Sequence, residues 1–152
     1  LKFIAKHVFN FYVKDPANND EKYLRIKIRN LIEQLQKDGL DKKKFFKTIK
    51  NLKYSNNVVN FYVNDNIKKN SFFSKKTQKL ILNKMFFLQP YEVIFRSLSE
   101  SIKLIGKKYY VARGRKLDKL IYDIKNNRSF KATLGGCIIE KVNETVIIYK
   151  EK

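Results

Sequence analysis

The sequence has few of the residues that supply most catalytic and metal-binding groups. Its 152 residues include one histidine, His7, one cysteine, Cys137, and no tryptophan. A single cysteine excludes a disulfide within the chain and cannot form a cysteine-rich zinc site, which favours a reducing compartment. Cys137 lies in an apolar run and is expected to be a buried small side chain. His7 has no second histidine to help it hold a metal, so neither metal binding nor general-base catalysis is expected of it.

Acidic residues are also scarce, and this scarcity sets the charge. Fourteen Asp and Glu residues stand against 34 Lys and Arg, so the formal net charge is +20. Such an excess is typical of a protein that binds a polyanion, because each neutralised phosphate releases a condensed counterion. Nucleic acid is therefore the expected partner. Since 28 of the 34 basic residues are lysine, the composition bias of an AT-rich genome accounts for part of the excess.

Long hydrophobic runs are absent as well. No apolar stretch approaches the roughly 20 residues of a membrane span. The chain begins with Leu1 and shows no signal-peptide pattern, so we expect a fragment of a longer cytoplasmic protein with no membrane partner. A hydrophobic content of 43% is enough for one ordinary core or two small ones.

The stretch from Asp15 to Arg29 combines a turn, a helix start and a cationic stripe. Asp15 precedes a proline and is pushed out of the helical region, and the polar residues that follow can cap a helix beginning near residue 20. Spacings of four, three and four predict one buried apolar face on this helix, made of Leu24, Ile28, Leu31 and Leu35. The helix is expected to close at Gly39.

The rest of the chain predicts an α+β fold that is mostly α. A second helix, single or broken near Ser55, is expected over residues 41–66 and would pair with the first as an antiparallel hairpin. Residues 67–89 are too irregular to type, and a regular helix follows from Pro90 to Gly106. After that we expect a small C-terminal segment with a short helix and an antiparallel β meander over residues 130–134, 137–142 and 145–149.

Basic and aromatic residues interleave between residues 107 and 116, which read Lys-Lys-Tyr-Tyr-Val-Ala-Arg-Gly-Arg-Lys. This pattern is expected where phosphates are bound and a base or ribose stacks on an aromatic ring. A solvated loop is the equal alternative.

Two motifs resemble one known family. Asp15-Pro16-x-Asn18, an acid at Asp20, an aromatic at Tyr23 and then Arg25-x-Lys27-Ile28-Arg29 resemble the signature that follows the catalytic domain of tRNA(Ile)-lysidine synthetases. The family pattern ends Arg-Asn-Arg-Ile-Arg, and Ile26 and Lys27 stand here for its Asn and middle Arg. Residues 132–139, which read Ala-Thr-Leu-Gly-Gly-Cys-Ile-Ile, follow Arg-Gly-Arg-Lys-Leu at 113–117 and resemble the C-terminal segment of alphaproteobacterial members.

The resemblance implies a function for the parent enzyme. The whole enzyme activates the C2 position of the wobble cytidine in the CAU-anticodon isoleucine tRNA with ATP and Mg, and lysine then displaces the nucleotide to give lysidine. The family's ATP motif, Ser-Gly-Gly-x-Asp-Ser, is absent here. We therefore expect a tRNA-binding C-terminal portion that holds no cofactor, does no chemistry alone and has tRNA and a missing N-terminal catalytic domain as partners. The alternative is a stand-alone basic module, without catalytic activity, that binds RNA or another protein.

The same resemblance divides the chain into three segments and predicts roles for particular residues. Residues 1–19 would lead out of the catalytic domain, 20–105 would form a helical substrate-binding domain, and 106–152 would form a small basic segment. The predicted tRNA contacts are Arg25, Lys27, Arg29, Arg113, Arg115 and Lys116. The predicted structural motif is Asp15, Pro16, Asn18, Asp20 and Tyr23. A structural alternative for Arg25 and Arg29 is an ion pair with Asp15 or Asp20.

Overall fold

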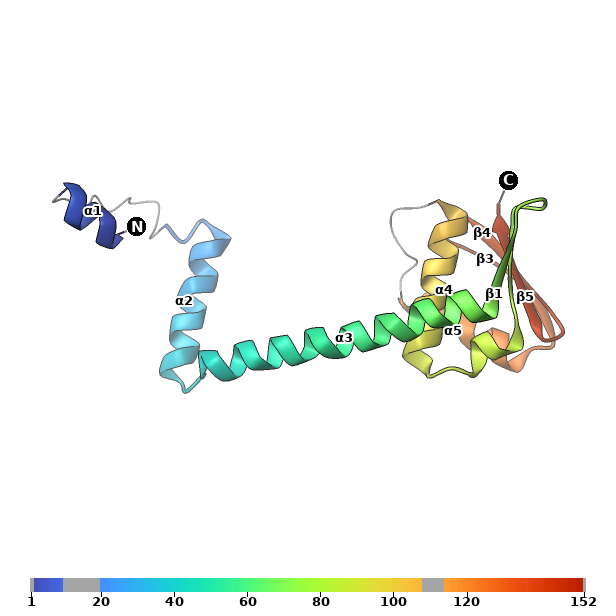
Figure 1. Cartoon of the computed structure of the whole chain (residues 1–152), viewed down its shortest axis with the longest axis horizontal. Coiled ribbons are helices and arrows are strands. Elements are labelled where there is room, and N and C mark those ends of the chain that lie inside the picture. Colours follow the sequence, from blue (N-terminus) through green and yellow to red (C-terminus); the bar gives the residue numbers. More distant parts are fainter. Residues whose placement is uncertain (1, 10–19, 108–113, 152) are drawn as a thin grey trace. The chain divides into compact units, whose positions relative to one another are not determined.

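The computed structural model describes residues 2–9, 20–107 and 114–151 (Figure 1). The chain forms two compact units, Leu1–Asn51 and Leu52–Lys152. Helices make up most of the described chain, and one antiparallel sheet accounts for the strands. The predicted α+β class, mostly α, is confirmed. None of the described helices has both the length and the hydropathy needed to cross a membrane.

The first unit contains α1 (Lys2–Phe9), α2 (Leu24–Lys37) and the first turns of α3 (Lys42–Asn70). α2 begins at Leu24 rather than near residue 20, because the chain first makes a turn in which the Tyr23 amide donates to the Asp20 carbonyl at 3.2 Å. Gly39, with φ of +99°, ends α2 as predicted. The Asp41 carboxylate then accepts the backbone N–H of Lys43 at 2.8 Å and caps α3.

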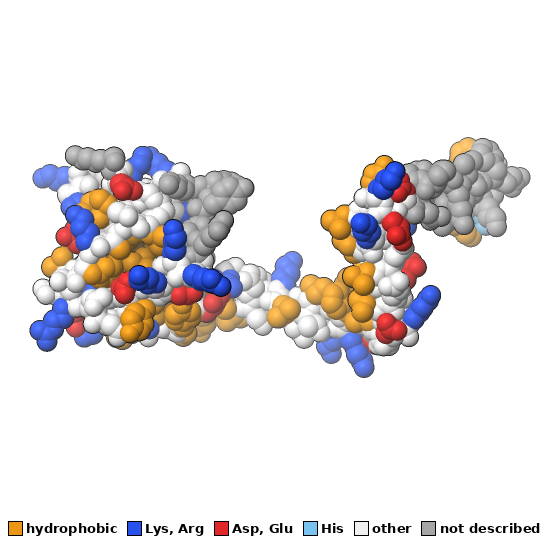
Figure 2. Space-filling model, turned by 180° about the vertical axis from the view of Figure 1, so that it is seen from behind, with side chains coloured by type: hydrophobic (Ala, Val, Ile, Leu, Met, Phe, Trp, Pro, Cys, Tyr) orange, Lys and Arg blue, Asp and Glu red, His pale blue; other side chains and the backbone are white. Residues whose placement is uncertain are grey.

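The apolar face predicted for α2 is not the buried one. Ile26 is only 2% exposed, whereas Leu24 is 71% exposed and Leu31 is 54% exposed. α3 is a single unbroken helix whose apolar side chains up to Tyr62 are mostly exposed as well. The expected antiparallel pairing therefore does not bury the apolar faces of these two helices, and hydrophobic side chains are visible on the surface of α2 (Figure 2).

The second unit contains the rest of α3 and a five-stranded sheet with order β1-β2-β5-β4-β3. Its remaining elements are β1 (Ser71–Ser74), β2 (Lys79–Leu82), η2 (Lys84–Leu88), α4 (Tyr91–Gly106), α5 (Gly114–Asn126), β3 (Ser129–Leu134), β4 (Cys137–Val142) and β5 (Thr145–Lys150). The predicted C-terminal meander is present as β3, β4 and β5. β1 and β2 extend it, and they went unpredicted because runs of two and three apolar residues carry no clear period.

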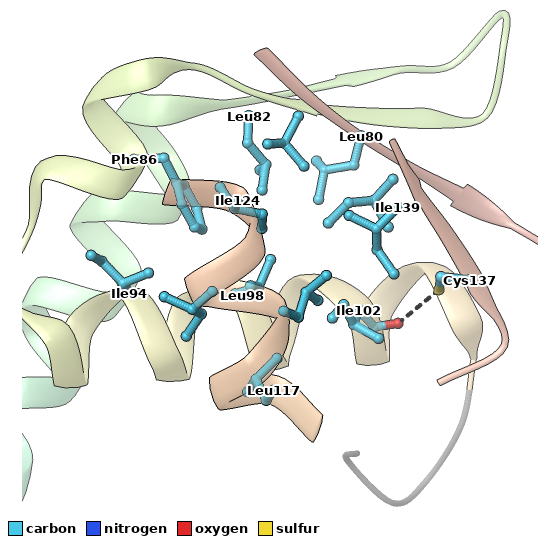
Figure 3. Packing of buried hydrophobic residues seen from close by; sticks show 14 of the residues in the cluster. Leu80, Leu82, Phe86, Ile94, Leu98, Ile102, Leu117, Ile124, Cys137 and Ile139 are labelled. Atoms are coloured by element: carbon cyan, nitrogen blue, oxygen red, sulfur yellow. Dashed lines mark hydrogen bonds between the residues drawn. The ribbon is translucent and has the colours of Figure 1, made fainter. Parts of the chain in front are cut away.

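α4 and α5 pack on one face of this sheet (Figure 1). Alternate strand residues point into the core between sheet and helices, as the two-residue period of a strand requires. The buried cluster contains residues of η2, of both helices and of the sheet (Figure 3). Its members include Leu80, Leu82, Phe86, Ile94, Leu98, Ile102, Leu117, Ile121, Ile124, Ile139, Val146 and Ile148. The expected boundary between residues 105 and 106 falls inside this shared core.

The end of α4 touches the β3–β4 turn. A Cβ added at Gly106 would lie 2.3 Å from the backbone oxygen of Gly135, so only glycine permits this approach. Gly135 itself has φ of +65°, which the two-residue turn requires. Beside it the Cys137 thiol donates to the Ile102 carbonyl at 3.3 Å (Figure 3). Cys137 is fully buried, as predicted.

A buried polar cluster attaches the end of α3 to this unit. The Asn66 side-chain amide donates to the Phe86 carbonyl at 3.3 Å and to the Ser97 hydroxyl at 3.2 Å. Its oxygen accepts from the Asn70 amide at 2.8 Å. Asn66 is 2% exposed, and its hydrogen bonds join α3 to η2 and to α4.

The glycine contact predicts a specific loss of stability. Gly106→Ala forces α4 away from the β3–β4 turn, and we expect it to lower the free energy of unfolding by about 1–3 kcal/mol. Gly114→Ala is the matched control, since a Cβ there meets nothing closer than 4.0 Å. Chemical denaturation of both variants measures the difference. Equal stability of Gly106→Ala and the wild-type chain would refute the contact.

The buried cluster predicts a second loss. Asn66→Ala leaves buried polar partners unpaired, so we expect a destabilisation of about 1–3 kcal/mol. Asn64→Ala, on the exposed side of the same helix, should change the midpoint of urea unfolding very little. If the two variants have the same midpoint of urea unfolding, the buried polar cluster does not stabilise the unit.

Candidate nucleic-acid interface

The predicted tRNA contacts Arg25, Lys27 and Arg29 all lie on α2, but they divide between two sides of the helix. Arg25 and Arg29 are four residues apart and lie on the same side, whereas Lys27 is two residues from each and faces elsewhere. All three side chains are exposed. The Arg25 guanidinium lies over the Tyr23 ring at 5.3 Å from the ring centroid. Stacking of this kind limits the conformations of the arginine while leaving its N–H groups free to donate.

Arg25 and Arg29 border a groove between α2 and the first turns of α3. The groove has a volume of about 740 Å³, and its charged lining residues are Arg25, Arg29, Lys42 and the acid Glu33. Its apolar lining is Ile28, Ile32, Leu35, Leu40, Phe45 and Phe46. Hydrophobic side chains gather at this junction of α2 and α3 in Figure 2. The groove was not predicted, because an antiparallel hairpin of the two helices would bury the apolar residues that line it.

The turn before α2 contains two residues of the predicted structural motif, Asp20 and Tyr23. The Asp20 carboxylate accepts the backbone N–H of Lys22 at 3.0 Å, and Tyr23 is the N-cap residue. Asp15, Pro16 and Asn18 lie outside the described residues. Within the described residues, neither Arg25 nor Arg29 forms an ion pair with Asp20. The structural alternative for these arginines thus fails for Asp20, and its other partner, Asp15, lies outside the described residues.

The second predicted set lies at the start of α5. Arg115 and Lys116 are exposed in its first turn, which contains no acidic residue. Arg113 lies outside the described residues, as do Lys108, Tyr109 and Tyr110. The first acid of α5, Asp118, accepts a hydrogen bond from the Tyr91 hydroxyl, and this bond raises the pKa of Tyr91 above its usual value. The helix N-terminus carries a partial positive charge, and Arg115 and Lys116 add to it. The first turn of α5 has no acid that would offset this charge.

Potential metal ligands do not gather in the described part of the chain. No group of three or more His, Cys, Asp or Glu side chains is placed to hold a metal among the residues described. The Gly135-Gly136 pair is a tight turn packed on α4, since a Cβ at Gly135 would lie 2.6 Å from Ile102. These glycines therefore form a packed turn of the sheet and do not form a phosphate cradle.

Comparison with known proteins identifies relatives, although no family model matches the chain. The chain is 26% identical over 147 residues to a tRNA(Ile)-lysidine synthase from Wolbachia pipientis wMel. It is 29% identical over 152 residues to the tRNA(Ile)-lysidine synthase of Orientia tsutsugamushi strain Boryong. The chain is similar to these two tRNA(Ile)-lysidine synthases. The family resemblance seen in the motifs is thereby confirmed.

The alignments cover most of this chain but only a part of each relative. Each alignment covers 92% of this chain but 33% of the relative. The chain therefore spans about a third of the length of the curated synthases that it matches. Both relatives are named as tRNA(Ile)-lysidine synthases, a name that denotes a tRNA-modification enzyme.

Proposed function

We propose that this chain is the tRNA-binding portion of a tRNA(Ile)-lysidine synthase. The whole enzyme, in this proposal, uses ATP to ligate lysine to C2 of the wobble cytidine in the CAU-anticodon isoleucine tRNA. The observation that carries the proposal is the similarity to two such synthases over 92% of the chain. The net charge of +20 supports it, because tRNA is a polyanion.

The residues of α2 supply one set of phosphate contacts in this proposal. Arg25 and Arg29 point to the same side, and the planar fork of each guanidinium can meet two phosphate oxygens at once. The stacking of Arg25 on Tyr23 supports a defined direction for that fork. Lys27, on another side of the helix, would reach a different phosphate or none.

Arg115 and Lys116 supply a second set, with Arg113 as its third predicted member. Contacts of this kind carry no base sequence, but they fix the position and orientation of the nucleic acid. A tRNA body that is held in place presents its anticodon to the catalytic domain in an oriented way, which lowers the entropic part of the barrier. The function of this chain is then positioning, and residues 1–19 would lead to it from the catalytic domain.

The proposal predicts selective tRNA binding that depends on Arg29. We expect the chain to bind the CAU-anticodon isoleucine tRNA more tightly than the methionine tRNA with the same anticodon at about 0.15 M salt. Arg29→Ala should weaken isoleucine tRNA binding by about 1–3 kcal/mol and lower the slope of log affinity against log salt by about one. Filter binding or fluorescence anisotropy across a salt series measures both quantities.

Arg128→Ala is the matched control, because it removes the same charge from an exposed position outside the predicted set. Equal binding of the two tRNAs, together with equal effects of Arg29→Ala and Arg128→Ala, would contradict the proposal and leave charge as a nonspecific anchor. The gene offers an independent check. A phosphate-loop signature encoded upstream of Leu1 supports the synthase, and a start codon at Leu1 supports the stand-alone module.

A further inference from the structure

The five-stranded sheet has a second face that no described helix covers (Figure 1). The strand register places two rows of side chains on it, each running across all five strands from β1 to β3. One row is Phe72, Ile81, Ile147, Glu140 and Lys131, and the other is Ser74, Lys79, Tyr149, Ile138 and Thr133. Because neighbouring strand residues alternate between faces, these rows point away from the core residues Leu80, Leu82 and Ile148.

This open face combines aromatic rings with lysines. Phe72 is 66% exposed. It belongs to β1, an edge strand that pairs on one side only. The Lys79 ammonium lies 4.8 Å from the centroid of the Tyr149 ring, and the Tyr149 hydroxyl donates to the Glu140 carboxylate at 3.3 Å. These contacts hold the Tyr149 ring on the sheet, and the residue is half-buried there.

More lysines surround the rings. Lys75 and Lys76 are exposed in the turn that joins β1 to β2, next to the row that contains Lys79. Lys131 is exposed on β3 at the opposite edge of the sheet. Glu140 is the one acid in the two rows, and it already accepts the Tyr149 hydroxyl.

Charge decides between the partners that such a face could accept. A second copy of this chain would bring another +20 charge against these lysines, so self-association through the face is electrostatically disfavoured. A polyanion has the complementary charge. Among polyanions, unpaired nucleotides also offer a flat apolar surface that matches the rings, because bases outside a duplex can stack on aromatic side chains. Bases within a duplex are stacked on one another and cannot do so.

We propose that the open face of the sheet binds an unpaired segment of RNA. Phe72 stacks on one base, Tyr149 contacts a neighbouring one, and Lys79 with the lysines of the β1–β2 turn contacts the phosphates between them. The inference deepens the proposed function and rests on it for the identity of the ligand, RNA. It uses different residues, however, and assigns them to unpaired nucleotides instead of the phosphate backbone of the tRNA body.

The test compares single-stranded with double-stranded RNA on the full chain. The probes are an unstructured adenosine-rich RNA oligonucleotide and a blunt RNA duplex of the same length, each with a fluorescent label for anisotropy. Phe72→Ala should weaken binding of the single strand by about tenfold, the effect expected for loss of one stacked base. It should change duplex binding less than about twofold, since phosphate contacts remain.

Matched variants separate stacking from general effects. Tyr122→Ala removes an aromatic ring that is 67% exposed on α5, away from the sheet, and should leave both RNAs bound as tightly as before. Lys79→Ala should lower the salt dependence of single-strand binding by about one unit of slope. It also serves as the second variant on the face if circular dichroism shows that Phe72→Ala does not fold.

The outcomes distinguish this inference from the proposed function. Unchanged single-strand binding by Phe72→Ala and Lys79→Ala, with tRNA binding still weakened by Arg29→Ala, would overturn the sheet-face assignment and leave tRNA binding in place. Failure of the chain to bind tRNA or either probe would overturn both. A shift in sedimentation on Phe72→Ala with unchanged RNA binding would instead make the face a surface for self-association and would also overturn the inference.

Discussion

Packing of α4 and α5 against one face of the sheet is the interaction on which the second unit depends. The buried isoleucines and leucines of both helices meet alternate residues of β2, β4 and β5, and the contact between Gly106 and Gly135 lets the end of α4 reach the β3–β4 turn. Since these helices occupy one face, no described helix covers the other. The same packing thus explains both the stability of this unit and the accessible rows that contain Phe72 and Tyr149.

A second feature of the structure is that several exposed arginine side chains form no ion pair within the described chain. Three ion pairs join described side chains, and none of them involves Arg25, Arg29 or Arg115. Unpaired exposed cations gain little within the chain and repel one another, so a polyanionic partner would remove an unfavourable term as well as add contacts. Aromatic neighbours such as Tyr23 beside Arg25 and Tyr149 beside Lys79 hold some of these cations in defined places.

Much of the fold could be predicted because its core elements have strong periods. The spacing of Ile94, Leu98 and Ile102 predicts α4, and glycine and asparagine turns delimit the final three strands. β1 and β2 could not be predicted, since Phe72-Phe73 and Leu80-Ile81-Leu82 are too short to show a period. Ile26 shows a further limit. It is buried although the apolar stripe of α2 predicts Leu24 in its place.

The candidate site was predictable only in part. A spacing of four places Arg25 and Arg29 together, and that much follows from the helix period alone. The same period places Lys27 on another side of the helix. The open sheet face required the pairing of β1 with β2 and of β2 with β5, because Phe72 and Tyr149 are far apart in sequence and meet on one surface only through that register.

Ultraviolet cross-linking of the bound CAU-anticodon isoleucine tRNA, with the cross-linked peptides mapped by mass spectrometry, tests the central claim most directly. The claim is that RNA contacts particular faces of this chain, and that net charge alone does not account for binding. We expect cross-links to concentrate on the peptides that contain Tyr23–Arg29 and Phe72–Lys79. Cross-links confined to the lysine-rich start of α3, or spread over all exposed lysines in proportion to their number, would contradict it.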